Sequence, residues 1–144
     1  MDEIVIKRIQ IEDISDLNSF VENLGSSEKS FRYFKTRPLT IIGNHLCTLL
    51  AYKENIPVGY GHLDKEADNI WLGIAVSPTY QGRGLGKLIM SELLRIAQME
   101  NVKFIKLTVD HSNSVAWQMY EKLGFQQIGS DKVKRMYKYR VQSG

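Results

Sequence analysis

The chain has 144 residues, of which 43% are hydrophobic and 24% are charged, so it suits one globular domain and is too apolar for a disordered protein. Nineteen basic and sixteen acidic side chains give a net charge of +3, which is too small to indicate a nucleic-acid-binding protein. No apolar run approaches the ~20 residues that span a bilayer, and a single cysteine excludes an internal disulfide or a multi-cysteine zinc site. We expect a single domain over residues 1–144 that is cytoplasmic, holds no metal and has no nucleic-acid or membrane partner.

The beginning of the chain predicts one strand and two helices. Alternating isoleucines over residues 4–6 are typical of a strand, and apolar residues with helical spacing follow over residues 11–21. Gly25 ends that helix, and a serine cap predicts a second short helix over residues 26–34, which Pro38 prevents from extending far.

Three β-rich runs come next. Residues 47–52 and 58–63 are separated by a turn-like segment over residues 53–57, which predicts a hairpin. The run over residues 70–76 extends this meander as a third antiparallel strand. Cys47 lies in the first run, where we expect a small buried strand residue rather than a nucleophile.

The second half of the chain predicts a strand–helix–strand unit and a closing hairpin. Apolar residues form one helical stripe over residues 85–97, and the apolar run over residues 102–109 predicts a strand covered on both faces, as parallel strands usually are. A last helix is expected over residues 114–123, ended by Gly124 in a left-handed conformation. Residues 126–139 then predict an antiparallel hairpin whose basic second strand reads as an ordinary edge strand.

The most informative stretch is a glycine-rich turn between the third strand of the meander and the long helix. Gly82, Gly84 and Gly86 let the backbone approach a ligand, and the free amides of the first helical turn attract an anion. Arg83 and Lys87 add two cations to this position. The sequence therefore predicts a phosphate site.

Two common phosphate-binding motifs do not fit this turn. A Walker A loop requires glycine where Gln81 stands and serine or threonine where Leu88 stands. A dinucleotide-binding G-x-G-x-x-G that starts at Gly82 requires glycine in place of Lys87, and it belongs to a first strand–helix unit.

The turn instead resembles the signature Q/R-x-x-G-x-G/A of the GNAT family of N-acetyltransferases, matched by Gln81-Gly82-Arg83-Gly84-Leu85-Gly86. A second stretch, residues 113–125, is similar to the family motif N-x-x-A-x-x-x-Y-x-x-x-G-F. The resemblance implies an α/β (α+β) fold: a mixed, mostly antiparallel twisted sheet of about six or seven strands. About four helices would flank the sheet, and a central βαβ unit would bind the cofactor.

The resemblance also implies acetyl-coenzyme A (acetyl-CoA) as cosubstrate and direct attack by an amine in a ternary complex. Tyr120 matches the position that protonates the departing thiolate, and Asn113 lies two turns before it on the same helix face. Gly73 is consistent with a bulge that opens a slot beside the strand. The residues expected to contact the cofactor are Ile74, Ala75, Val76, Gln81, Gly82, Arg83, Gly84, Leu85, Gly86, Lys87 and Asn113.

The general base is left open by the sequence. Many similar proteins carry a glutamate on the strand before the glycine turn, but residues 70–76 contain no carboxylate. We expect His62 to act as the base or to contact the substrate, since its unperturbed pKa lies nearest neutrality. Asp68 and Glu66 are the alternatives.

The acceptor is expected to meet the segment from Ser30 to Arg37, which combines three aromatic and three cationic side chains. Phe31, Arg32 and Trp71 are the expected substrate contacts; the competing interpretation is a short amphipathic helix whose phenylalanines join the core. The resulting hypothesis is an N-acetyltransferase for the primary amine of a small molecule, such as an amino sugar, a nucleotide sugar or another metabolite. Protein or peptide acetylation, a non-catalytic acyl-CoA-binding regulatory module and a homodimer are left open.

Overall fold

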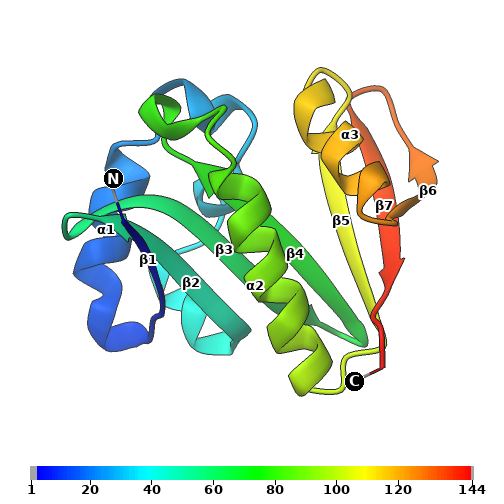
Figure 1. The fold of residues 1–144 in the computed structure, drawn as a ribbon, viewed down its shortest axis with the longest axis horizontal. Helices are drawn as coiled ribbons and strands as arrows, with labels where there is room; N and C mark the ends of the chain where they lie inside the picture. The colour runs from blue at the N-terminus through cyan, green and yellow to red at the C-terminus, as the bar shows by residue number, and fades with distance from the viewer. Residues whose placement is uncertain (1–2, 144) are drawn as a thin grey trace.

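The computed structural model describes residues 3–143, so Met1, Asp2 and Gly144 of the expected domain lie outside the described residues. A seven-stranded sheet with the order β1-β2-β3-β4-β5-β7-β6 forms its centre (Figure 1). The strands are β1 (Ile4–Arg8), β2 (His45–Lys53), β3 (Ile56–Glu66), β4 (Asn69–Val76), β5 (Phe104–Asp110), β6 (Gln126–Ser130) and β7 (Lys134–Arg140). The α-helices are α1 (Ile14–Glu22), α2 (Leu85–Met99) and α3 (Ser114–Lys122), with 3₁₀ turns at Ile11–Asp13, Gly25–Lys29, Tyr33–Lys35, Leu39–Asn44 and Pro78–Tyr80.

The sheet carries a hydrophobic core on each face, because successive side chains of a strand point to opposite sides. In β2, Leu49 and Ala51 belong to the core on the α2 face, whereas Leu50 and Tyr52 belong to the core formed with α1 and the segment that follows it. The mostly antiparallel fold predicted from the sequence is confirmed, with β4 and β5 as its one parallel pair among the described strands.

Two glycines of β3 let α2 lie close to the sheet. A Cβ atom added at Gly61 would lie 2.5 Å from Ile89 Cγ2, and one added at Gly59 would lie 2.8 Å from Ile89 Cδ1. Both distances are shorter than any ordinary contact, so a larger residue would push the helix away from the strand. This packing fixes the position at which α2 begins.

The β2–β3 hairpin is tighter than the sequence pattern predicted. Its turn consists of Glu54 and Asn55, whose φ values of 50° and 68° are those of a two-residue hairpin turn. Ile56 and Pro57, which were expected in the turn, already belong to β3 and pair with β2.

The sheet divides at β4 and β5. These two strands pair at one position, Trp71 with Lys106, and separate toward their carboxyl ends (Figure 1). The register between β3 and β4 runs without a shift, so no bulge at Gly73 opens the gap. Gly73 is required for a different reason: a Cβ atom there would lie 2.6 Å from the ring of His62.

Three other expectations need correction. The helix expected over residues 26–34 is two separate 3₁₀ turns, because that segment lacks a continuous apolar stripe. β5 alternates between buried and exposed side chains instead of being covered on both faces, since most of its pairing is antiparallel with β7. β7 lies inside the sheet and β6 forms its edge, so the basic strand is not an edge strand.

Within residues 3–143, none of the helices combines the length and the apolar character that crossing a membrane requires.

Candidate acyl-transfer site

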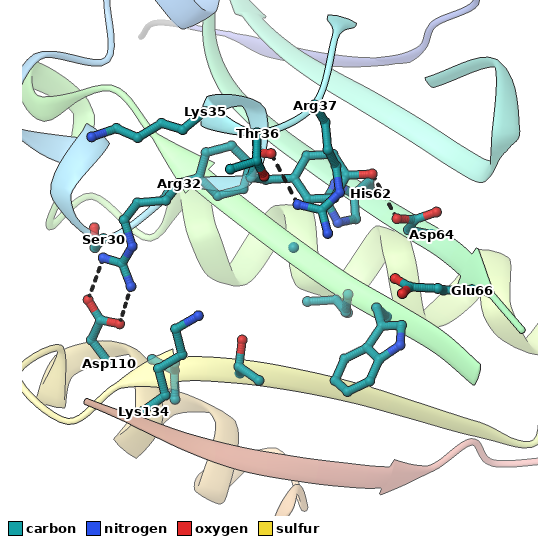
Figure 2. Close-up of a pocket in the computed structure, with 17 residues that line it drawn as sticks. Ser30, Arg32, Lys35, Thr36, Arg37, His62, Asp64, Glu66, Asp110 and Lys134 are labelled. Carbon is teal, nitrogen blue, oxygen red and sulfur yellow. Dashed lines mark hydrogen bonds and ion pairs between the residues drawn. The ribbon is translucent and has the colours of Figure 1, made fainter. Parts of the chain in front are cut away.

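A cavity of about 540 Å³ opens on the α1 face of the sheet, where β4 and β5 have separated (Figure 2). Its floor includes His62, Gly73 and Thr108, which come from three different strands. Leu72 and Val109 also line it, although both belong to the core on the opposite, α2 face. The cavity therefore extends into the gap between the two strands.

The roof of the cavity is residues 30–37, which we call the strap. Phe31 packs against Tyr60 with ring centroids 5.3 Å apart, and Tyr33 packs against His62 at 4.3 Å. Arg37 stacks on the Tyr33 ring, with 4.3 Å between the guanidinium carbon and the ring centroid. Its phenylalanines join the core, as the amphipathic-helix interpretation expects, and the segment also lines the cavity.

The strap is attached to both walls of the cavity. Arg32 makes a bidentate ion pair with Asp110 at the end of β5, with distances of 2.9 and 3.0 Å (Figure 2). On the other wall, the Tyr33 hydroxyl donates to Asp64 of β3 at 2.7 Å. Asp110 raises the pKa of Arg32, mainly through its side-chain hydrogen bond and despite partial burial of the guanidinium.

A second hydrogen-bond network fixes the inner end of the strap. His45 contacts the Tyr33 hydroxyl at 2.7 Å through Nε2 and the Thr48 hydroxyl at 2.8 Å through Nδ1. Because Tyr33 donates to Asp64, it accepts from His45 Nε2, so His45 is neutral with its proton on that nitrogen. Burial lowers the pKa of His45 to about 4.

His62 is 3% exposed and lies between the strap and Gly73. Its Nδ1 contacts the Tyr60 hydroxyl at 2.6 Å, and burial keeps that phenol protonated by raising its pKa. Tyr60 is therefore the donor, and the imidazole proton lies on Nε2. Burial lowers the pKa of His62 well below its usual range, with further lowering from His45 and Arg37.

His62 Nε2 faces free space in the cavity. This nitrogen has no hydrogen-bond partner within residues 3–143. Every fully buried side-chain nitrogen or oxygen in that part of the chain does have a partner, so Nε2 is not fully buried. It must then be accessible from the cavity that His62 lines. In this tautomer it presents a hydrogen-bond donor, whereas a general base requires a free electron pair.

These neutral histidines predict a loss of stability in acid. In the unfolded chain, His45 takes up a proton below about pH 6.5, whereas in the folded protein it does so only near its lowered pKa of about 4. The free energy of unfolding therefore falls as the pH drops through that window. For His45 alone we expect a decrease of about 1–2 kcal/mol in the free energy of unfolding between pH 7 and pH 5. His62 acts in the same direction.

Urea unfolding at several pH values measures this effect. The variant His45→Gln, which keeps a polar side chain without a titration in this range, should have a flatter pH profile than the wild type. Equal stability of the wild type at pH 7 and pH 5 would contradict the buried neutral state.

The glycine-rich turn lies at the amino end of α2. Gly82 and Gly84 have φ values of 76° and 80°, and a Cβ atom at either would meet nothing within 4 Å, so the backbone there is open to solvent. The first hydrogen bond within α2 runs from the Leu88 amide to the Gly84 carbonyl. The amides of residues 85–87 precede it and lack partners within the helix, which makes them available to an anion.

Gln81 anchors this turn. Its side-chain amide donates to the Ser27 hydroxyl at 2.7 Å, and that hydroxyl donates to the Val76 carbonyl at 2.8 Å. Gln81 thus ties the turn to the segment after α1 and to the end of β4, which leaves its side chain occupied within the protein. Arg83 stacks 5.0 Å from the Tyr80 ring, and Lys87 makes no ion pair in the described part of the chain.

The second motif, residues 113–125, contains the residues that cap both ends of α3. The Asn113 side chain accepts from the Ala116 amide and caps the helix. At the other end, Gly124 has a φ of 105°, and the Phe125 amide donates to the Tyr120 carbonyl in a Schellman motif. The predicted helix end is confirmed.

Tyr120 lies on the α2 face, opposite the cavity opening, and is 7% exposed. Burial raises the pKa of its phenol to about 12. Its hydroxyl has no hydrogen-bond partner among residues 3–143 and is not fully buried, so it reaches free space.

The structure brings some of the expected residues together and not others. Phe31, Arg32, His62 and Trp71 line the cavity, whereas Tyr120 and Asn113 do not. The glycine turn and β4 residues 74–76 lie outside its lining as well. Leu85 and Ala75, two of the residues expected to contact the cofactor, are only 5% exposed and can offer it only backbone groups.

Sequence reasoning missed several side chains of the cavity. Asp64, Asp110 and Lys134 line it, and His45, which was not expected in the site, holds Tyr33. Glu66 lines the cavity without a hydrogen bond or ion pair to any residue described here, whereas Asp68 is not part of the lining. Only the alternation of Asp64 with His62 along β3 could have indicated that they share a face.

The remaining polar candidates have structural roles. His111 contacts the Asp131 carbonyl at 2.8 Å and Arg135 at 3.3 Å, and so belongs to a polar cluster just before α3. Cys47 is 2% exposed, and burial raises the pKa of its thiol to about 11, which confirms the buried strand residue. Across residues 3–143, no three or more His, Cys, Asp or Glu side chains gather in a way that could hold a metal ion.

Comparison with known proteins gives one family. The model of the acetyltransferase (GNAT) family matches residues 11–125. The chain is 33% identical over 87 residues to a ribosomal-protein-bS18-alanine N-acetyltransferase from Haemophilus influenzae, covering 60% of this chain and 59% of that protein. It is 35% identical over 54 residues to an L-2,4-diaminobutyric acid acetyltransferase from Vibrio parahaemolyticus, covering 38% of this chain and 29% of that protein.

Among solved structures, the PaiA N-acetyltransferase from Thermoplasma acidophilum, crystallised with coenzyme A, has the same fold. The TM-score is 0.77 and the identity is 22%, with 96% of this chain and 99% of that chain covered. The chain thus spans nearly all of this structure but little more than half of the Haemophilus relative.

Proposed function

The chain belongs to the acetyltransferase (GNAT) family, and from this we propose that it transfers an acetyl group from acetyl-CoA to the primary amine of a small molecule. The observation that carries the proposal is the cavity of about 540 Å³ that continues into the gap between β4 and β5. Its volume suits a small ligand, since pockets for such molecules measure roughly 300–1,000 Å³.

The two sides of the gap support separate binding of the two substrates. The anion-binding turn of residues 82–87 and Tyr120 belong to the α2 face, and the strapped cavity lies on the α1 face. Beyond Trp71, the edge of β4 that faces β5 has no strand partner. The Val76 carbonyl accepts from Ser27, and the other main-chain groups of this edge are free to pair with the amide groups of pantetheine. A thioester held along this edge would meet an amine that enters from the cavity.

Each residue near the gap then has a chemical task. Acetyl-CoA supplies the thioester carbonyl that the amine attacks. An amide of Ile74 or Ala75 donates toward the thioester oxygen as charge develops on it, and Tyr120 donates a proton to the departing sulfur. His62, with its proton on Nε2, donates to an acceptor oxygen of the substrate and so orients it, and Glu66 receives the amine proton through water.

Protein acetylation is the second candidate, and the named relatives favour it. The Haemophilus relative is a ribosomal-protein-bS18-alanine N-acetyltransferase, and a RimI N-alpha-acetyltransferase from Mycobacterium tuberculosis is 40% identical over 68 residues, covering 47% of this chain and 39% of that protein. The strap argues for the small acceptor, because it crosses the cavity and leaves less room for an extended peptide.

Release of free coenzyme A from acetyl-CoA tests both candidates. We expect turnover with an amine panel of amino sugars and diamino acids, and much weaker turnover with a hexapeptide that begins with alanine. Glu66→Gln should lower kcat if that carboxylate receives the proton. The opposite order of acceptors would make the protein candidate the better one, and no turnover with any acceptor would reject the acetyltransferase.

A further inference from the structure

The ion pair between Arg32 and Asp110 has a special place in the fold. It joins two residues 78 positions apart, one on the strap and one at the end of β5. None of the other side-chain hydrogen bonds and ion pairs within residues 3–143 links the β1–β4 half to the β5–β7 half. Beyond the point where the main-chain pairing of β4 and β5 ends, the Arg32–Asp110 pair is the one side-chain ion pair or hydrogen bond within residues 3–143 that joins the two sides of the cleft.

The geometry of the pair suits a tie that opens and closes. Both guanidinium nitrogens that contact the carboxylate lie within 3.0 Å of it, so the pair is well aligned. The Arg32 side chain is 36% exposed, so water can solvate its guanidinium when the pair separates. An acceptor can therefore enter when the tie opens, and the tie reforms above it.

The inner end of the strap is held more firmly than the outer end. Tyr33 contacts both Asp64 and His45, and its ring packs against His62. Opening of the Arg32 tie would leave these contacts in place. The Arg32 side chain would then move away from Asp110, while Phe31 stays packed on Tyr60 and the inner end keeps the cavity floor intact.

From these contacts we propose that Arg32 and Asp110 determine acceptor specificity by tying the strap across the cleft, which admits small amines and excludes peptide N-termini. The proposal rests on the acetyltransferase function proposed above. It assigns to the pair a positioning role: neither side chain needs to touch the reacting atoms. It predicts that loss of the tie turns the strapped cavity into a wider, open groove.

Substitutions of each partner test the tie through the ratio of two acceptors. Arg32→Gln and Asp110→Asn should each raise kcat/KM for the alanine hexapeptide relative to a small amine by about tenfold or more. The exchange Arg32→Asp with Asp110→Arg should return the ratio toward that of the wild type. Arg95→Gln, which removes an exposed arginine paired with Glu92 on α2, is the control and should leave the ratio unchanged.

A second measurement does not depend on catalysis. Cys47 is the only cysteine and is buried, so the variant Thr108→Cys places one reactive thiol on the cavity floor. A bulky polyethylene-glycol maleimide should label it several-fold faster when Arg32→Gln is also present, and at the original rate in the exchanged pair.

The outcomes separate the tie from the proposed function. An unchanged acceptor ratio in both single variants, or equal labelling rates with and without the tie, would overturn the inference even if small amines are turned over. If no acceptor is turned over by the wild type, the acetyltransferase proposal fails, and the labelling rates alone decide whether the pair closes the cleft.

Discussion

The variant Gly84→Glu should lose measurable binding of acetyl-CoA. Gly84 precedes the first turn of α2, whose free amides and partial positive charge form the expected phosphate site. A carboxylate there would repel the phosphates, and at about 4 Å two unit charges interact by about 4 kcal/mol near a protein surface. We expect the dissociation constant in calorimetric titration to rise by about 100-fold or more.

The control for this variant is Gly84→Gln, which has the same shape without the charge. Gly84 has a φ of 80°, so any side chain adds backbone strain of roughly 1–2 kcal/mol, and a Cβ atom meets no neighbour within 4 Å. Glutamine should therefore weaken binding far less than glutamate. Equal binding by the wild type and Gly84→Glu would show that the turn does not hold the phosphates.

The variant Tyr120→Phe should retain acetyl-CoA binding and lose about 10²–10⁴-fold in kcat, the usual contribution of general acid catalysis. Its hydroxyl has no partner within the described chain, so removal of that group alone should cost little stability. Burial raises the pKa of the phenol to about 12, which keeps the proton on it at neutral pH. The same apolar surroundings raise the proton affinity of a departing thiolate, whose pKa in water is ~8.5.

Tyr137→Phe separates chemistry from stability. The Tyr137 hydroxyl donates to Glu121 at 2.6 Å, so its loss should lower the thermal midpoint while kcat stays near that of the wild type. Rates of coenzyme A release and melting curves on both variants measure the difference. A Tyr120→Phe protein with the turnover of the wild type would exclude this phenol as the acid.

Local sequence patterns predicted the parts of the fold that neighbouring residues determine. The glycine turn before α2, the β2–β3 hairpin and the Gly124 helix end each depend on a few consecutive residues with special backbone preferences. The segment over residues 25–44 was beyond such reasoning, because short 3₁₀ turns have no lasting periodicity. The place of β7 between β5 and β6 depends on tertiary pairing and not on its own alternation.

Parts of the site that consist of consecutive residues could be predicted from the sequence, and parts that join distant residues could not. The glycine-rich turn of residues 82–87 is contiguous, so charge and glycine spacing were enough to predict a phosphate site there. The acceptor cavity joins residues from the strap, β3, β4 and β5, and its contacts depend on the packing of the whole sheet. Arg32 was expected near the substrate, but nothing near Asp110 in the sequence indicated its partner 78 residues away.

The separation of β4 and β5 also bears on aggregation. Beyond Trp71 the sheet has two unpaired strand edges, and such edges normally invite another chain to add as a strand. Here they lie in the interior of the molecule, with α2 and α3 on one face and the strap on the other. The protein thus keeps backbone donors and acceptors ready for a ligand while shielding them from the intermolecular pairing that an outer edge would risk.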